Sequence, residues 1–184
     1  FILDELIQSI RILIDKIEAI RELKHENRFT DFLQAILKLR LTIWGWSIND
    51  ESRLGTSTAG SDAGRGDLTI QASGRNIALI EAFILGSQKY TIDHILKCPN
   101  YVRTLKRAYV IVYYLGASSK FEKKWLDYKS TVLKINYPET FSIDVENEFV
   151  DLFDNFEDVN NLKIAKTIHT SNFELFHVMI NLGK

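Results

Sequence analysis

The chain has 184 residues, of which 46% are apolar and 26% are charged, and its formal net charge is -1. Enough apolar material is present for a sizeable core, and the near-neutral charge excludes a global basic field that would attract nucleic acid. The single cysteine, Cys98, excludes an internal disulfide framework and a multi-cysteine zinc site, and with no apolar run long enough to span a bilayer we expect a cytoplasmic protein without a membrane partner.

The first predicted element is a long amphipathic helix over residues 2–24. Its apolar positions alternate by four and three residues along one stripe: Leu3, Ile7, Ile10, Ile14 and Ile17. Heptad-like spacing of this kind suits either a helix that packs on its own domain or one that pairs with a neighbouring domain or subunit. Because the chain begins with Phe1 rather than Met, we expect it to be part of a longer protein.

A second helix is predicted to begin at Asn27 or Thr30, either of which can cap it, and to end at Arg40. Aromatic and β-branched residues then predict a strand over residues 42–48. Residues 49–64 are rich in Asp, Ser, Thr and Gly, which predicts a surface loop.

A β-hairpin follows, with strands over residues 67–72 and 76–85 and a turn at Ser73–Gly74. The second strand is apolar on both faces except for Glu81, and such a continuous apolar run is typical of a central strand that is covered on both sides. A charge in such a strand costs free energy unless it is paired or binds a metal. Glu81 is therefore the clearest indication of function in the sequence.

The remaining elements predict an α/β fold with a mixed central β-sheet flanked by helices. They are a helix over 91–101, a strand over 107–115, a helix opened by a capping box at 119–122, an acidic segment over 139–161 with a short helix at 145–153, and a closing hairpin over 163–170 and 173–182. The helix over 91–101 suits a right-handed crossover between parallel strands. In the closing hairpin we expect His169 and His177 to point to opposite faces, so that they do not converge.

Asp67 and Glu81 stand at related positions of the two hairpin strands. They are fourteen residues apart in the sequence, and adjacent antiparallel strands can bring both carboxylates to one end of the sheet. Two convergent carboxylates suit Mg²⁺ or Mn²⁺, which can activate water and neutralise charge on a phosphodiester. The structural alternative is that Asp67 is a turn residue and Glu81 is the ion-pair partner of Arg65, Arg75 or a helix lysine.

With these residues the chain resembles the PD-(D/E)XK, or restriction-endonuclease-like, nucleases. The core pattern of that superfamily is a strand entered by Gly-x-x-Asp, a turn, and a buried strand that bears a Glu, and Gly64-Arg65-Gly66-Asp67 and Glu81 match it. A preceding helix with an acidic residue, here Glu26, fits the family's α-β-β-β-α-β order over residues 26–115. The resemblance implies that Asp67 and Glu81 bind Mg²⁺ or Mn²⁺ and that Glu26 assists them.

The sequence departs from the family pattern at Phe83. In the family, a lysine two residues after the acid orients the attacking water and stabilises the transition state. Lys89, just past the strand, and Lys97, on the following helix, are the candidates to replace it, and Lys97 is preferred. Two structural alternatives apply: Lys97 is an exposed i, i+4 partner of Asp93, and His94, one turn before Lys97, has no ligand role.

The resemblance implies a metal-dependent nuclease that acts on DNA rather than RNA, with residues 1–24 as a packing or connecting helix and residues 25–184 as the nuclease-like domain. Similar domains are attached to bacterial defence ATPases, so we also expect an effector role in a larger antiviral defence protein. The alternative is a catalytically inactive module of the same fold that binds nucleic acid or a partner protein, with the N-terminal helix as the connection to other domains or subunits.

Overall fold

The computed structural model describes residues 1–20, 26–50, 68–101, 104–144, 149–152, 156 and 161–184. The strands are β1 (Trp46–Asp50), β2 (Leu68–Ala72), β3 (Arg75–Ile84), β4 (Arg107–Tyr114), β5 (Val150–Asp151), β6 (Leu162–His169) and β7 (Phe173–Asn181). The α-helices are α1 (Ile2–Asp15), α2 (Ile17–Ile20), α3 (Glu26–Thr42), α4 (Gln88–Ile95) and α5 (Phe121–Leu133). Short 3₁₀ turns include η3 (Cys98–Tyr101), η4 (Ser118–Lys120) and η5 (Glu139–Phe141).

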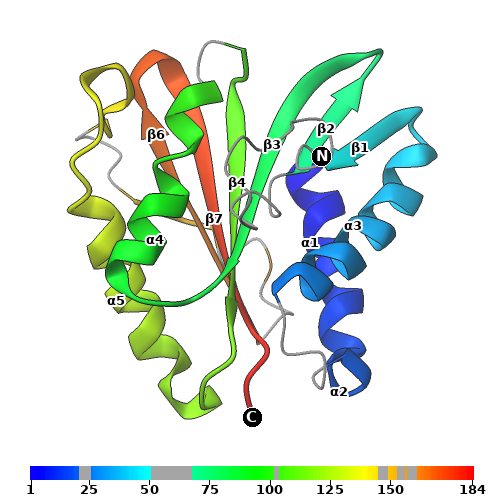
Figure 1. The fold of residues 1–184 in the computed structure, drawn as a ribbon, viewed down its shortest axis with the longest axis horizontal. Helices are drawn as coiled ribbons and strands as arrows, with labels where there is room; N and C mark the ends of the chain where they lie inside the picture. The colour runs from blue at the N-terminus through cyan, green and yellow to red at the C-terminus, as the bar shows by residue number, and fades with distance from the viewer. Residues whose placement is uncertain (21–25, 51–67, 102–103, 145–148, 153–155, 157–160) are drawn as a thin grey trace, which may run out of the picture.

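The strands form a seven-stranded mixed sheet in the order β1-β2-β3-β4-β7-β6-β5. Helices α1 and α3 cover one face of the sheet, and α4 and α5 cover the other (Figure 1). The first three strands are antiparallel neighbours, β3, β4 and β7 run parallel, and β6 and β5 return antiparallel. The predicted α/β class with a mixed central sheet is thus confirmed.

The β2–β3 hairpin has the predicted turn. Ser73 and Gly74 both adopt left-handed backbone angles, with φ of 51° and 73°. This is the pattern of a two-residue turn whose twist matches that of the flanking strands. Helix α4 then crosses over one face of the sheet and leads the chain into β4, which runs parallel to β3 as predicted.

The apolar core lies in two layers, one on each face of the sheet. On the face of α1 and α3, Ile7 and Ile10 of the predicted apolar stripe are fully buried together with Leu6 and Leu13, so this helix is part of the core. Arg40 of α3 donates to Glu5 of α1 at 2.7 Å and ties the two helices together. On the other face, strand residues pack under α4 and α5 in a layer rich in aromatic rings.

The N-terminal helix is shorter than the 2–24 span predicted from the sequence. Helix α1 ends at Asp15, and Lys16 leaves the helical backbone with φ of -100° and ψ of 6° before the short α2. The last turn of α1 contains the carboxylate of Asp15 and no basic residue, which is unfavourable against the helix dipole and favours an end there. The apolar stripe continues past this point, which is why periodicity alone overran the boundary; residues 21–25 lie outside the described residues.

Other boundaries also moved from the predicted positions. Helix α3 continues to Thr42. Gly45, with φ of 72°, then turns the chain, so β1 begins at Trp46 instead of residue 42. Helix α4 begins earlier than residue 91, because the Ser87 side chain accepts a hydrogen bond from the Tyr90 amide and caps it. It also ends at Ile95, well before residue 101.

Two predictions in the second half of the chain were wrong. No capping box opens α5, because its first residue follows η4 and its N-cap, Lys120, makes no side-chain hydrogen bond. The short helix expected at 145–153 is replaced, in its described part, by β5, where Val150 pairs with Lys166 of β6. Residues 145–148 lie outside the described residues.

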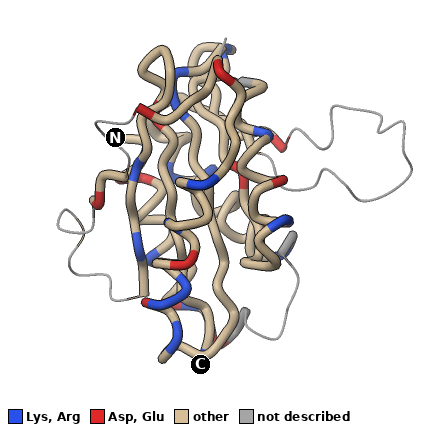
Figure 2. The backbone as a smooth tube through the Cα atoms, turned by 90° about the vertical axis from the view of Figure 1, so that its left-hand side faces the viewer, with Lys and Arg blue, Asp and Glu red and all other residues tan. Residues whose placement is uncertain are grey.

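On the side that carries α4 and α5, basic and acidic positions are interspersed and form no single block of either sign (Figure 2). This distribution agrees with the near-neutral net charge. Within the described residues, no helix has the length and apolar character required to cross a bilayer.

Candidate functional site

Glu81 lies in the middle of β3 and points toward α4. Its neighbours along the strand on the same face, Leu79 and Phe83, belong to the apolar layer beneath α4 and α5. β3 lies between β2 and β4, and the Glu81 side chain is 0% exposed. The sequence therefore predicted correctly that this carboxylate is buried within a central strand.

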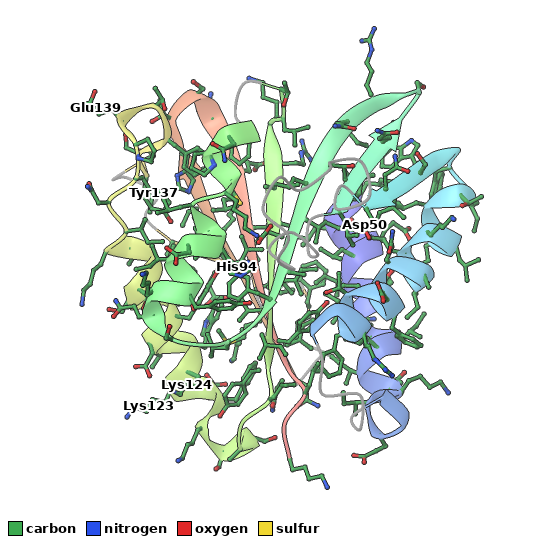
Figure 3. The ribbon with its side chains drawn as sticks, in the orientation of Figure 1. Asp50, His94, Lys123, Lys124, Tyr137 and Glu139 are labelled. Carbon is green, nitrogen blue, oxygen red and sulfur yellow. The ribbon has the colours of Figure 1, made fainter. Side chains whose placement is uncertain are left out.

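Two side chains from α4 and the turn after it converge on a single oxygen of Glu81. Lys97 Nζ donates to Oε1 at 2.5 Å, and His94 Nδ1 makes a hydrogen bond with the same atom. Figure 3 shows His94 on α4, between that helix and the sheet. The side chains of His94 and Lys97 are 13% and 36% exposed, so the site reaches solvent along the lysine. We call these three residues the Glu81 cluster.

The second carboxylate oxygen of Glu81 is treated differently. Oε2 is buried, and among the described residues no hydrogen-bond partner reaches it. Buried polar atoms in proteins are almost always hydrogen-bonded, and an unpaired one costs free energy. A buried carboxylate oxygen left without a donor is therefore a candidate ligand atom for a cation.

Aromatic rings hold the imidazole of His94 in place. The Phe83 ring lies 4.7 Å from the His94 ring, centre to centre, and the Tyr90 ring lies 4.4 Å from it. Phe83 is fully buried, and it occupies the position where the resemblance places a lysine. The side chain that departs from the family pattern thus packs directly on a member of the Glu81 cluster.

Cys98 lies close to the cluster but is not a nucleophile. Its side chain is fully buried, and this burial raises the pKa of the thiol well above its ordinary value. The nearby Glu81 carboxylate raises the thiol pKa further. Because a thiol must ionise to attack or to bind metal, Cys98 acts as an apolar filler of the core.

The other predicted site residues have different outcomes. Asp67 lies outside the described residues; its neighbour in the chain, Leu68, pairs with Ile80, which directly precedes Glu81. Glu26 is the first residue of α3, but its side chain is not among those described. Lys89 is exposed in the first turn of α4, and no contact between it and Glu81 is seen.

Lys97, in the turn after α4, bonds to Glu81, which matches the structural alternative of a helix lysine as the ion-pair partner of Glu81 and is also what a relocated lysine would do. His94, for which no ligand role was expected, bonds to the same oxygen. A signal for His94 was present, because residues three apart lie on one face of a helix and Lys97 was already a candidate. Within the described residues, no group of three or more His, Cys, Asp or Glu side chains is arranged to hold a metal.

A second buried polar cluster lies on the same face of the sheet. Tyr128 Oη is 2.8 Å from His177 Nδ1, and His177 Nε2 is 3.1 Å from Thr167 Oγ1. Thr167 Oγ1 is in turn 2.8 Å from His169 Nε2, and His169 Nδ1 is 2.9 Å from the carbonyl oxygen of Phe141. A carbonyl can only accept, so each group donates to the next from Tyr128 to Phe141. We call this series the histidine chain.

The histidine chain corrects the prediction that His169 and His177 point to opposite faces. A turn at residues 171–172 would pair His169 with Glu174 and His177 with Lys166. The observed register instead sets His177 opposite Ala165 and His169 opposite Phe173, one residue away. A slip of one residue moves a side chain to the other face of a strand, so the two histidines meet through Thr167. Burial lowers the pKa of His169 to about 4 and that of His177 to about 3, the latter also through nearby His169, so both are neutral.

By its fold, this is an α/β protein with a mixed sheet. Its candidate site is a buried carboxylate to which one lysine and one histidine are hydrogen-bonded. The chain matches no protein-family model, no curated protein and no solved structure.

Proposed function

We propose that the chain is a metal-dependent phosphodiesterase, a DNA nuclease of the restriction-endonuclease-like type, with Glu81 and Lys97 at its centre. The observation that carries the proposal is the unequal hydrogen bonding of the two carboxylate oxygens of Glu81. Oε1 is bonded to the Lys97 ammonium, while Oε2 is buried without a partner among the described residues. A buried carboxylate that serves structure alone is normally satisfied at both oxygens.

The order of elements supports the proposal. α3, β1, β2, β3, α4 and β4 follow one another, with β1 to β3 antiparallel and β4 parallel to β3. The family that the sequence resembles has a core of α-β-β-β-α-β order with its acidic residue in the third strand, and Glu81 lies in β3. The support is by analogy of topology, so the site's own chemistry must carry the functional argument.

The donor chemistry of Glu81 fits Mg²⁺ or Mn²⁺. Both cations prefer hard oxygen ligands, and Oε2 is a carboxylate oxygen with no hydrogen-bond partner among the described residues. In the proposal Asp67 supplies a second carboxylate, as expected from the sequence, and the chain continues from it directly into Leu68, which pairs beside Glu81. When bound, the ion supplies a water of lowered pKa and positive charge for the phosphate.

The residues of the Glu81 cluster divide the remaining work. The Lys97 ammonium lies at the solvent-exposed side of the site, where its charge stabilises the extra negative charge that develops on a phosphodiester in the transition state. Its bond to Oε1 holds that charge in place before substrate arrives. Lys89, also proposed from the sequence, is exposed and would contact phosphates outside the site.

Plasmid nicking in Mg²⁺ or Mn²⁺ tests the proposal with matched variants. Glu81→Gln keeps the shape of the side chain but removes the charge, and we expect a loss of roughly 100-fold or more in the nicking rate. Glu174→Gln is the control, because Glu174 also pairs with a lysine, Lys166 at 3.0 Å, but lies on β7 outside the site. Asp67→Asn tests the second carboxylate in the same assay.

Equal nicking by the wild type and by Glu81→Gln would show a contaminating nuclease and overturn the proposal. Binding of DNA or RNA without any metal-dependent cleavage would favour the inactive nucleic-acid-binding module instead. The effector role in a larger defence protein rests on the resemblance alone, and protection of cells from phage by the wild type, but not by Glu81→Gln, is its test.

A further inference from the structure

We propose that His94 is a positioning residue for a divalent-cation site at Glu81 Oε2, and that Phe83 holds His94 in that role. The inference rests on the proposed function, since it concerns the same carboxylate. It adds a role that the family pattern does not contain, because the pattern has a lysine where this chain has Phe83.

The distribution of donors around Glu81 is the first step. Two donors and two carboxylate oxygens are present, yet both donors bond to Oε1. One donor on each oxygen would satisfy the carboxylate fully, whereas this arrangement leaves Oε2 bare in a fully buried side chain. The two bonds also fix the rotation of the carboxylate, so the direction of the Oε2 lone pairs is set before a cation binds.

The position of His94 is itself fixed by its neighbours. Phe83 stands two residues after Glu81 on β3, so its ring lies on the same face and packs on the imidazole at 31° between planes. Tyr90 lies one turn earlier on α4 and covers a second side of the imidazole. The Tyr90 ring can pack against the backbone of residue 86 because that residue is glycine: a Cβ there would lie 3.1 Å from the Tyr90 ring.

Phe83 and Lys97 therefore differ from the family pattern in a linked way: one replaces the expected lysine, and the other supplies an ammonium group from a different position. The space beneath α4 that a lysine at position 83 would use is filled by the Phe83 ring, which orients His94. The ammonium group is instead that of Lys97, three residues after His94, and it donates a hydrogen bond to Oε1 of Glu81, the oxygen that His94 also contacts. Partners that orient a metal ligand typically change metal affinity by about 10–100-fold when they are removed.

Binding of Mn²⁺, followed by titration calorimetry and by the electron paramagnetic resonance signal of free Mn²⁺, tests the role of His94 without any cleavage assay. His94→Leu removes the donor, and we expect its Mn²⁺ affinity to fall by about 10–100-fold. His94→Asn places an amide N–H near the position of Nδ1, and we expect it to retain most of the wild-type affinity. Glu81→Gln should remove the binding, which assigns the signal to this site.

Phe83→Leu is the second variant, since it keeps an apolar core side chain but removes the ring that packs on His94. We expect a several-fold weaker Mn²⁺ affinity, smaller than the loss in His94→Leu. Circular dichroism and thermal melting of each variant establish that it is folded before its affinity is compared.

The outcomes separate this inference from the proposed nuclease activity. Wild-type affinity in folded His94→Leu, with cleavage intact, would overturn the positioning role and leave the nuclease standing. Mn²⁺ binding that weakens in His94→Leu and returns in His94→Asn, in a protein that cleaves no DNA, would support the inference while the nuclease proposal fails. Absence of Mn²⁺ binding in the wild type, or binding that survives Glu81→Gln, would overturn the inference.

Discussion

Glu81 and His177 lie in the same row of the sheet, and the two are satisfied in opposite ways. Val110 of β4 pairs with Glu81 on one side and with His177 on the other, so the polar residues are separated by a single apolar strand position. Both side chains are fully buried. Every donor of the histidine chain has an acceptor, whereas the Glu81 cluster has an oxygen left over among the described residues.

The difference shows that burial alone does not identify a functional group. The histidine chain uses its polar atoms to tie α5, β6, β7 and η5 together, which is the ordinary structural use of a buried network. In the Glu81 cluster, the acceptor atom Oε2 has no donor among the described residues, which costs stability; binding sites commonly contain such unsatisfied groups. Four changes in conditions or sequence test this difference between the two clusters.

The largest expected effect is acid destabilisation through the histidine chain. The pKa of His169 is lowered from 6.5 to about 4 and that of His177 from 6.5 to about 3, because both are buried. Below pH 6.5 the unfolded chain therefore binds protons that the folded chain does not, so stability is present above that pH and is lost as the pH falls. At about pH 5 each histidine lowers the free energy of unfolding by about 2 kcal/mol, about 4 kcal/mol together.

Urea unfolding from pH 7 to pH 5 measures this effect above the range in which most carboxylates titrate. His169→Asn retains a donor for the Phe141 carbonyl but removes one imidazole, so the pH dependence of its unfolding free energy should be about half that of the wild type. A wild-type unfolding free energy that stays constant across this range would contradict the assignment of both histidines as neutral.

The second effect is the loss of catalysis in Lys97→Met. Methionine keeps an unbranched apolar chain but lacks the ammonium, so we expect the nicking rate to fall by about 100-fold, equivalent to about 2.7 kcal/mol of transition-state stabilisation. Because this change removes the ammonium partner of the buried Glu81 carboxylate, circular dichroism and thermal melting establish that the variant is folded before its rate is compared. Lys166→Met, which removes the partner of Glu174, is the control and should nick as the wild type does.

The sequence predicted the sheet and Glu81 because both depend on local patterns. The apolar run of β3 with one carboxylate, the Ser73–Gly74 turn and the apolar strand β4 can all be read from neighbouring residues. The pairing of Glu81 with His94 could not be read in this way. It depends on how α4 lies across the sheet, which the Ser87 cap and the packing of Tyr90 against Gly86 decide.

The histidine chain was missed for a different reason. The hairpin β6–β7 was predicted correctly, but its turn was expected to contain two residues, 171 and 172, and the observed turn contains three, which displaces the register by one residue. A 3₁₀ turn at Thr170–Asn172, with Ser171 and Asn172 both at positive φ, sets that register and leaves His169 opposite Phe173. Sequence patterns locate strands more reliably than they locate pairing partners, and a shift of one residue reverses every face.

The third effect is destabilisation by Thr167→Val, which interrupts the histidine chain at its centre. Valine has a similar shape, but the His177 Nε2–H loses its acceptor and His169 Nε2 loses its donor. We expect the free energy of unfolding to fall by about 2 kcal/mol, with Mn²⁺ binding at Glu81 unchanged. Thr30→Val is the control on the other face of the sheet, where the threonine makes one long bond of 3.4 Å to Tyr113 and should cost less.

The smallest effect has the opposite sign and contrasts the two clusters most directly. Glu81→Leu combined with Lys97→Met removes both charges at once and replaces the unpartnered Oε2 with apolar atoms, so no charge is left alone in the core. Replacement of buried ion pairs by apolar residues is often neutral or stabilising, and we expect the free energy of unfolding to rise by about 1 kcal/mol, or about 2–4 °C in the melting temperature. A loss of several kcal/mol instead would mean that the Glu81 cluster stabilises the fold as the histidine chain does, and the argument for a reserved ligand oxygen would fail.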